Sequence, residues 1–131
     1  MIKQITTYIG TQAGLTIGTD LFAGFRPSNA PDECVTILET GGGKPDFYLP
    51  DSVEKMIQVL TRGKTYFSAR DLADSVYEKL HGKAGIALPV VDAKSFYVNT
   101  IDALQVPQFI GIDEKGRIEF SANFIFRIQG G

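Results

Sequence analysis

The sequence has no Trp, one Cys, one His and no run of basic residues. Cys34 has no second cysteine with which to form an internal disulfide. Together with the single His81, it also leaves too few ligands for a zinc finger, a Cys-x-x-Cys redox site or a multi-histidine metal site. The 13 Lys and Arg residues are balanced by 15 Asp and Glu, giving a formal net charge of −2. This balance argues against a protein that binds nucleic acid by covering its phosphates.

Long apolar runs are also missing. The first seven residues contain one Lys and no continuous apolar segment, and the longest apolar stretch, residues 85–91, is interrupted by Pro89. Neither a signal peptide nor a membrane span is therefore predicted. We expect a soluble protein that is made in a reducing cytoplasm.

The chain contains enough apolar residues to form one hydrophobic core. The chain has 131 residues, of which 44% are hydrophobic. Domains usually contain about 100–200 residues, and a chain of about 150 residues buries roughly 70% of its unfolded surface. We therefore expect one domain over residues 1–131 that needs no disulfide, metal or cofactor to fold.

Helical periodicity occurs twice. Ile2, Ile5 and Ile9 follow the spacing of one helical face and predict a first helix that ends near Gly14. Residues 68–71 have the pattern of a capping box and predict the start of a second helix, with Gly82 just after its end. The apolar stripe of this second helix consists of Leu72, Ala73, Val76, Tyr77 and Leu80.

Strand patterns cover residues 33–40, 54–62, 96–106, 108–112 and 117–128, whereas residues 18–32 and 83–94 are predicted to be loops. In the last strand apolar and polar residues alternate, as in a sheet with one buried face. Gly116 in the turn before it favours a hairpin with the preceding strand. The element order α-β-β-α-β-β-β predicts an α+β fold, an antiparallel sheet of about five strands covered by two helices.

Candidate chemical sites are few, and each has an ordinary structural interpretation. Gly41-Gly42-Gly43-Lys44 resembles a phosphate loop in composition, but it lacks the P-loop spacing and is followed by Pro45 instead of a helix. Cys34 and His81 form a catalytic pair only if the fold brings them together, and a buried core Cys with a helix-end His is favoured.

The acidic and aromatic residues of the chain also have ordinary structural interpretations. Asp71, Asp74 and Glu78 share one helical face and suggest a metal site, but a solvated face is the better interpretation. The final strand has three aromatic residues that an RNA-stacking platform requires, yet it lacks flanking basic residues, so core packing is favoured. These aromatic residues are Phe120, Phe124 and Phe126.

A glycine-rich loop with apolar neighbours is the candidate assembly contact. A single-domain core has little use for exposed aromatic residues beside three glycines, whereas a protein interface does. The predicted interface residues are Gly41, Gly42, Gly43, Lys44, Phe47, Tyr48 and Leu49.

Three segments resemble a known family. Residues 31–42, residues 57–63 with Tyr66 and the helix after it, and residues 113–124 are similar to small phage proteins of the minor capsid and tail terminator (head–tail joining) class. The resemblance spans about the whole chain. It implies an α+β subunit of a ring, commonly a hexamer, that closes the tail tube and joins it to the head, without an active site or cofactor.

The resemblance also implies partners and a location. They are other copies of the chain, the major tail tube protein and head-completion proteins, in the virion and, during assembly, in the host bacterial cytoplasm. DNA passes the ring without being specifically bound, and no membrane is involved. Two alternatives from the residues stay open: a small hydrolase using Cys34 and His81, and a general protein-binding module.

Overall fold

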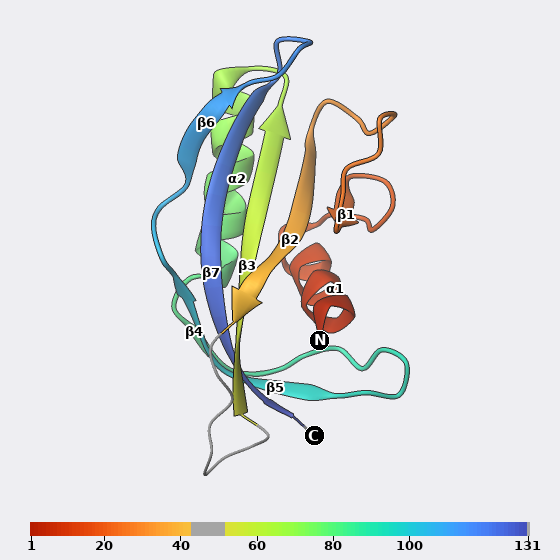
Figure 1. The fold of residues 1–131 in the computed structure, drawn as a ribbon, viewed down its shortest axis with the longest axis vertical. Helices are drawn as coiled ribbons and strands as arrows, with labels where there is room; N and C mark the ends of the chain where they lie inside the picture. The colour runs from red at the N-terminus through yellow and green to blue at the C-terminus, as the bar shows by residue number, and fades with distance from the viewer. Residues whose placement is uncertain (43–51, 131) are drawn as a thin grey trace.

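The computed structural model describes residues 1–42 and 52–130, which form a seven-stranded sheet and two helices (Figure 1). Among these residues, neither helix is long and apolar enough to cross a membrane. In chain order the elements are α1 (Ile2–Ala13), β1 (Leu21–Ala23), β2 (Cys34–Gly42), β3 (Ser52–Gly63), α2 (Tyr66–Leu80), β4 (Lys83–Ala87), β5 (Phe96–Ala103), β6 (Gln108–Ile112) and β7 (Ile118–Gly130).

The sheet is ordered β1-β2-β3-β7-β5-β4, and β6 also pairs with β7. All neighbours are antiparallel except β1 and β2, which are parallel. β5 pairs with residues 124–130 of β7, and β6 pairs with residues 118–121. These two strands therefore occupy successive halves of the same edge of β7.

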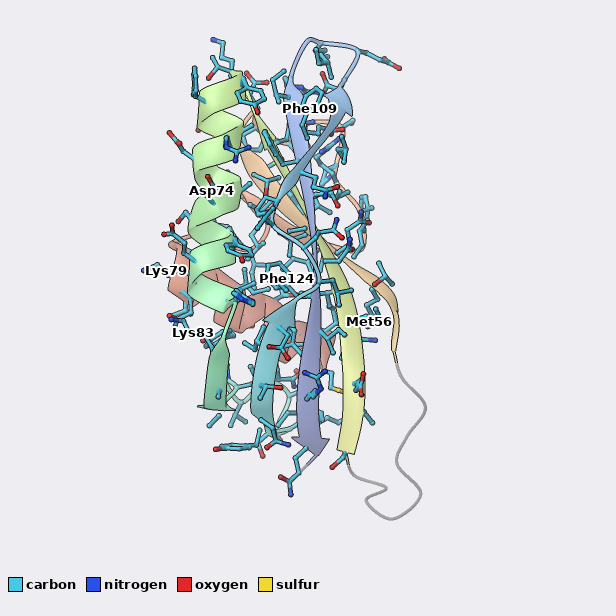
Figure 2. The ribbon with its side chains drawn as sticks, turned by 90° about the vertical axis from the view of Figure 1, so that its left-hand side faces the viewer. Met56, Asp74, Lys79, Lys83, Phe109 and Phe124 are labelled. Atoms are coloured by element: carbon cyan, nitrogen blue, oxygen red, sulfur yellow. The ribbon has the colours of Figure 1, made fainter. Side chains whose placement is uncertain are left out.

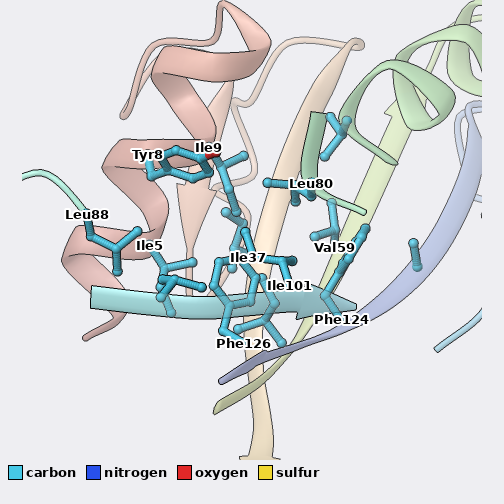
Figure 3. Packing of buried hydrophobic residues seen from close by; sticks show 14 of the residues in the cluster. Ile5, Tyr8, Ile9, Ile37, Val59, Leu80, Leu88, Ile101, Phe124 and Phe126 are labelled. Atoms are coloured by element: carbon cyan, nitrogen blue, oxygen red, sulfur yellow. The ribbon is translucent and has the colours of Figure 1, made fainter. Parts of the chain in front are cut away.

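The core lies between one face of the sheet and the two helices, as Figure 3 shows. The even-numbered residues 120–128 of β7 are buried, which confirms the predicted alternation. The neighbouring strands contribute Ile37, Val59 and Ile101, while the helices contribute Ile5 and Ile9 from α1 and Val76 and Leu80 from α2. One apolar layer thus fixes both helices on the same side of the sheet.

The α+β prediction is confirmed, but the sheet has seven strands where about five were predicted. The predicted loops 18–32 and 83–94 contain the edge strands β1 and β4. β5, predicted over residues 96–106, ends at Ala103. The Leu104 N–H makes one further hydrogen bond to the carbonyl oxygen of Asn123, and the chain then reaches Pro107, which has no N–H for a ladder. The hairpin joining β6 and β7 is confirmed.

The start of the second helix was predicted three residues too late. Thr65 is the N-cap: its Oγ1 accepts a hydrogen bond from the Ser68 N–H at 3.1 Å, and the Ser68 Oγ accepts one from the Thr65 N–H at 3.0 Å. Ser68 is thus the fourth residue (N3) of the real capping box, not the first, and Asp71 lies outside it. The helix ends as predicted before Gly82, whose φ of 76° suits glycine.

The end of β3 packs tightly against the first turn of α2 at Gly63. A Cβ at this position would lie 2.5 Å from the backbone nitrogen and 2.7 Å from the Cα of Ala69. We expect Gly63→Ala to lower the free energy of unfolding by about 1–3 kcal/mol, because the helix must move away from the sheet. Urea denaturation measures this loss, with Glu54→Ala on the exposed part of the same strand as the control. Equal stability of the two variants would contradict the predicted clash.

Candidate assembly interface

The predicted glycine-rich interface lies mostly outside the described residues. Gly41 and Gly42 are the last residues of β2, and Gly41 has a φ of 120° that favours glycine. Gly43, Lys44, Phe47, Tyr48 and Leu49 belong to the segment 43–51, which the structure does not describe. Their role in assembly stays a prediction.

Cys34 and His81 are not brought together. Cys34 is aligned across the sheet with Arg62 and Glu119, whereas the His81 Nδ1 accepts a hydrogen bond from Ala103, the partner of Phe124. Glu119 and Phe124 are five residues apart on β7, roughly 17 Å along the strand. Burial raises the pKa of the Cys34 thiol, the opposite of what a nucleophile requires. The catalytic pair is therefore not formed.

The acidic residues of α2 behave as a solvated face. Asp71 and Glu78 are exposed, and Asp74 lies 3.8 Å from Arg70 one turn earlier. Figure 2 shows Asp74 and Lys79 on the side of α2 away from the sheet. Among the described residues no group of three His, Cys, Asp or Glu side chains is placed to hold a metal ion.

The three aromatic residues of β7 are core residues. Phe120, Phe124 and Phe126 are all fully buried. Their rings are therefore out of reach of a nucleic-acid base, which confirms the core interpretation.

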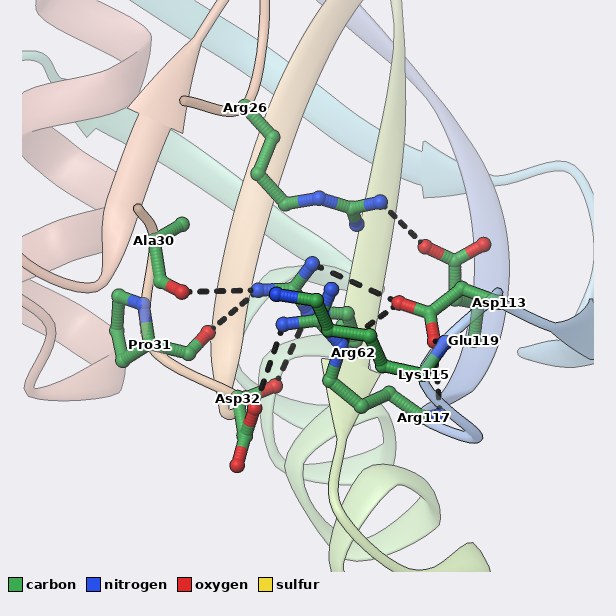
Figure 4. A network of polar contacts seen from close by, with 9 residues as sticks. All are labelled: Arg26, Ala30, Pro31, Asp32, Arg62, Asp113, Lys115, Arg117 and Glu119. Carbon is green, nitrogen blue, oxygen red and sulfur yellow. Dashed lines mark hydrogen bonds and ion pairs between the residues drawn. The ribbon is translucent and has the colours of Figure 1, made fainter. Parts of the chain in front are cut away.

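A polar network at one end of the sheet holds the β6–β7 hairpin in place (Figure 4). Arg62, almost fully buried on β3, donates to the carbonyl oxygens of Ala30, Pro31 and Asp32 at 2.6–3.2 Å. Its guanidinium also lies 3.8 Å from Asp113 in the hairpin turn. A buried cation that donates from Nε and Nη2 to a loop and pairs through Nη1 with a hairpin turn fixes the position of both.

Two further arginines complete the network. The Nε of Arg117 donates to the Asp113 carboxylate at 2.7 Å, and its Nη1 lies 3.3 Å from the Asp32 carboxylate. Arg26 pairs with Glu119 at 2.6 Å. Three arginines thus face three carboxylates on this end of the sheet. Sequence patterns gave no indication of the network because, apart from Arg117 and Asp113, its partners are far apart in the chain.

Asp113 is the acceptor at the centre of the turn. Burial pushes the pKa of its carboxyl upward, but hydrogen bonds from the backbone N–H and guanidinium of Arg117 and from the backbone N–H of Lys115 outweigh this effect. They leave the pKa below its ordinary value. The ionised form is therefore the one that the folded hairpin stabilises.

Exposed apolar side chains gather beside this hairpin. The ring of Tyr66 at the start of α2 contacts Phe67 and Phe109, with ring centroids 5.7 and 6.1 Å apart. Figure 2 shows Phe109 on β6 near the N-terminal end of α2. These side chains are 43–74% exposed. We define the β6 patch as Tyr66, Phe67, Val106, Phe109, Ile110 and Ile112.

The sequence contained one signal for the β6 patch. Residues 104–112 include no charged side chain. An edge strand is usually protected by charged residues, and an exposed apolar cluster marks an interaction site more often than an accident of the surface. A strand pattern by itself does not tell an edge strand from a central one.

An apolar groove lies at the other edge of the sheet, between α1 and β1. Its hollow has a volume of about 250 Å³, and Ile2 and Ala23 also line a second hollow of about 420 Å³ beside Leu38. We define the α1 groove by the residues of the first hollow, Ile2, Lys3, Thr6, Thr7, Ile17, Ala23 and Val91. The chain thus carries an exposed apolar patch at one edge and an apolar hollow at the other.

Comparisons with known proteins identify related sequences and folds. A family model described as bacteriophage tail terminator protein matches residues 8–129. No curated protein matches the chain. Among solved structures, a chain from the virion of a native gene transfer agent particle has a TM-score of 0.64 and 12% sequence identity, and the match covers 97% of this chain and 94% of that one.

The lowered pKa of Asp113 predicts how the stability of the fold changes as the pH falls. A carboxyl whose folded-state pKa lies below its unfolded value of about 3.9 contributes stability above that value, and the contribution is lost as the pH falls through the folded pKa. We expect Asp113→Asn to be less stable than wild type at pH 7, with a difference that shrinks below about pH 4.

Urea denaturation between pH 7 and pH 3 measures this difference. Glu114→Gln, in the same turn and exposed, is the control and should follow the wild type at each pH. A stability gap between Asp113→Asn and wild type that is as large at pH 3 as at pH 7 would rule out the proposed ionic role.

Proposed function

We propose that this chain, which belongs to the bacteriophage tail terminator family, forms a ring that closes the tail tube and joins it to the head. As a member of that family it is a structural subunit of a phage-type tail. The observation that carries the proposal is the extent of the family match, which runs from residue 8 to residue 129 and so includes both helices and all seven strands in whole or in part.

The surface of the chain supports assembly with other proteins. The β6 patch exposes aromatic and aliphatic side chains that a monomer gains nothing by exposing. Aromatic residues are the ones that protein interfaces use most at their centres. An exposed surface of this kind favours a role in which the chain forms a stable contact with another protein.

The partners follow from the same role. They are other copies of the chain, in a ring that is commonly a hexamer, together with the major tail tube protein and head-completion proteins. The ring resides in the virion after assembly in the host cytoplasm. Since the formal net charge is −2, DNA can pass the ring wall without being held to it.

Deletion of the gene in a particle-producing strain tests the proposal. We expect unjoined heads and tails of abnormal length in electron micrographs, because nothing closes the growing tube. A plasmid copy of the wild-type gene should restore joined particles, and the chain should be present in purified particles. Normal joined particles from the deletion strain would overturn the proposal.

A further inference from the structure

The two outer edges of the sheet lie on one cross-strand row. Leu21 of β1 pairs with Val35, and Val35 pairs with Thr61. Thr61 then pairs with Phe120, and Phe120 pairs with Phe109 of β6. β1 and β6 are therefore level with each other along the strand direction, at opposite sides of the sheet (Figure 1).

The two edges also run in compatible directions. β1 is parallel to β2, which is antiparallel to β3, which is antiparallel to β7, so β1 and β7 run the same way. β6 is antiparallel to β7 and hence to β1. The outer side of β1 is already occupied at Leu21, where Ile17 forms a parallel bridge and the Gly18 N–H donates to the Leu21 carbonyl oxygen. Two copies placed side by side thus bring β6 of one, antiparallel to β1, against the exposed side chain of Ile17 in the other.

Both edges carry apolar surface. The β6 patch is strongly exposed, with Phe67 74% and Ile112 63% exposed. The α1 groove is a hollow lined largely by apolar groups, including Ile2, Ile17 and Ala23. Apolar side chains that enter an apolar hollow remove both surfaces from water, which stabilises the contact.

We propose that the β6 patch of one copy docks into the α1 groove of the next copy. This contact rests on the proposed function, because a ring needs a heterologous contact between two different surfaces of the same chain. Because β1 and β6 lie on the same cross-strand row, a contact between them leaves successive copies without displacement along the strand direction. A repeated contact without such displacement closes into a ring when the strands follow the ring axis, whereas a displaced contact builds an open helix.

Charged substitutions test each surface separately. Phe67→Glu places a carboxylate in the patch, and it is tolerated by the fold because a negative charge in the first turn suits the N-terminus of α2. Ala23→Glu places one in the groove, at an exposed position of β1. Ile112→Lys and Ile17→Lys are second variants of the two surfaces. Val90→Glu is the control, since Val90 is 67% exposed and lies against Ala87 and Tyr97.

We expect both charged variants to retain the wild-type melting temperature and to fail to restore joined particles in the deletion strain. Val90→Glu should restore them. A variant that loses its fold is replaced by the second variant of the same surface. If Phe67→Glu or Ala23→Glu, correctly folded, restores joined particles, the proposed contact is wrong.

Cross-linking identifies which surfaces meet. Ala23 is level with Ala122, one residue beyond the Gln108 partner Ser121, so an antiparallel neighbour brings Ala23 level with Pro107 and next to Val106. In a Cys34→Ala background, a mixture of Val106→Cys and Ala23→Cys chains should give cross-linked dimers with a short bifunctional maleimide, both at high protein concentration and in particles.

The single-cysteine chains discriminate between arrangements. Neither chain should cross-link on its own, and the chain carrying both cysteines should give a ladder of multimers. Dimers from Val106→Cys alone would indicate a symmetric contact between two β6 strands, and no product from the mixture would mean that the patch binds another protein. Either result overturns the proposal.

The two proposals fail in different ways. Normal particles without the gene would remove the proposed function and this contact together. A defective deletion strain that is restored by folded Phe67→Glu and Ala23→Glu chains would leave the terminator role intact and remove only the contact between the β6 patch and the α1 groove.

Discussion

The register of β7 determines the rest of the structure. This strand pairs with β3 over residues 118–129 on one edge and with β5 and β6 on the other. Its even-numbered residues face the helices and its odd-numbered residues face the opposite side, where Glu119 joins the arginine network. A slip of one residue would exchange the two faces, putting charged groups in the core and phenylalanines in water.

The two faces have different consequences for assembly. The apolar face stabilises the chain by burying the core, at about 25 cal/mol per Å² of apolar surface removed from water. The network of Arg62, Asp113 and Arg117 on the other face anchors the hairpin that carries β6. Because the hairpin is fixed before any partner arrives, little further conformational entropy is lost when the β6 patch is covered, and more of the apolar gain remains as binding free energy.

Local sequence patterns predicted the helices and strands whose own residues carry a clear period. The alternation in β7 and the stripe of α2 were predicted because period and burial coincide there. β1 and β4 were missed because they have no periodic signal and form only by pairing with β2 and β5. The contacts of Arg62 join residues 30–51 positions apart in the chain, a distance at which no local pattern exists.

Low sequence identity with a shared fold has a physical explanation in this arrangement. A neighbour with 12% identity keeps the fold over nearly the whole chain, because sheet pairing needs only alternation at β7 and apolar volume under the helices. The proposed contact constrains the sequence more narrowly than the fold does, because one gene encodes both the β6 patch and the α1 groove. Any change in the patch alters every junction between identical copies at once, so a compensating change in the groove corrects them all together.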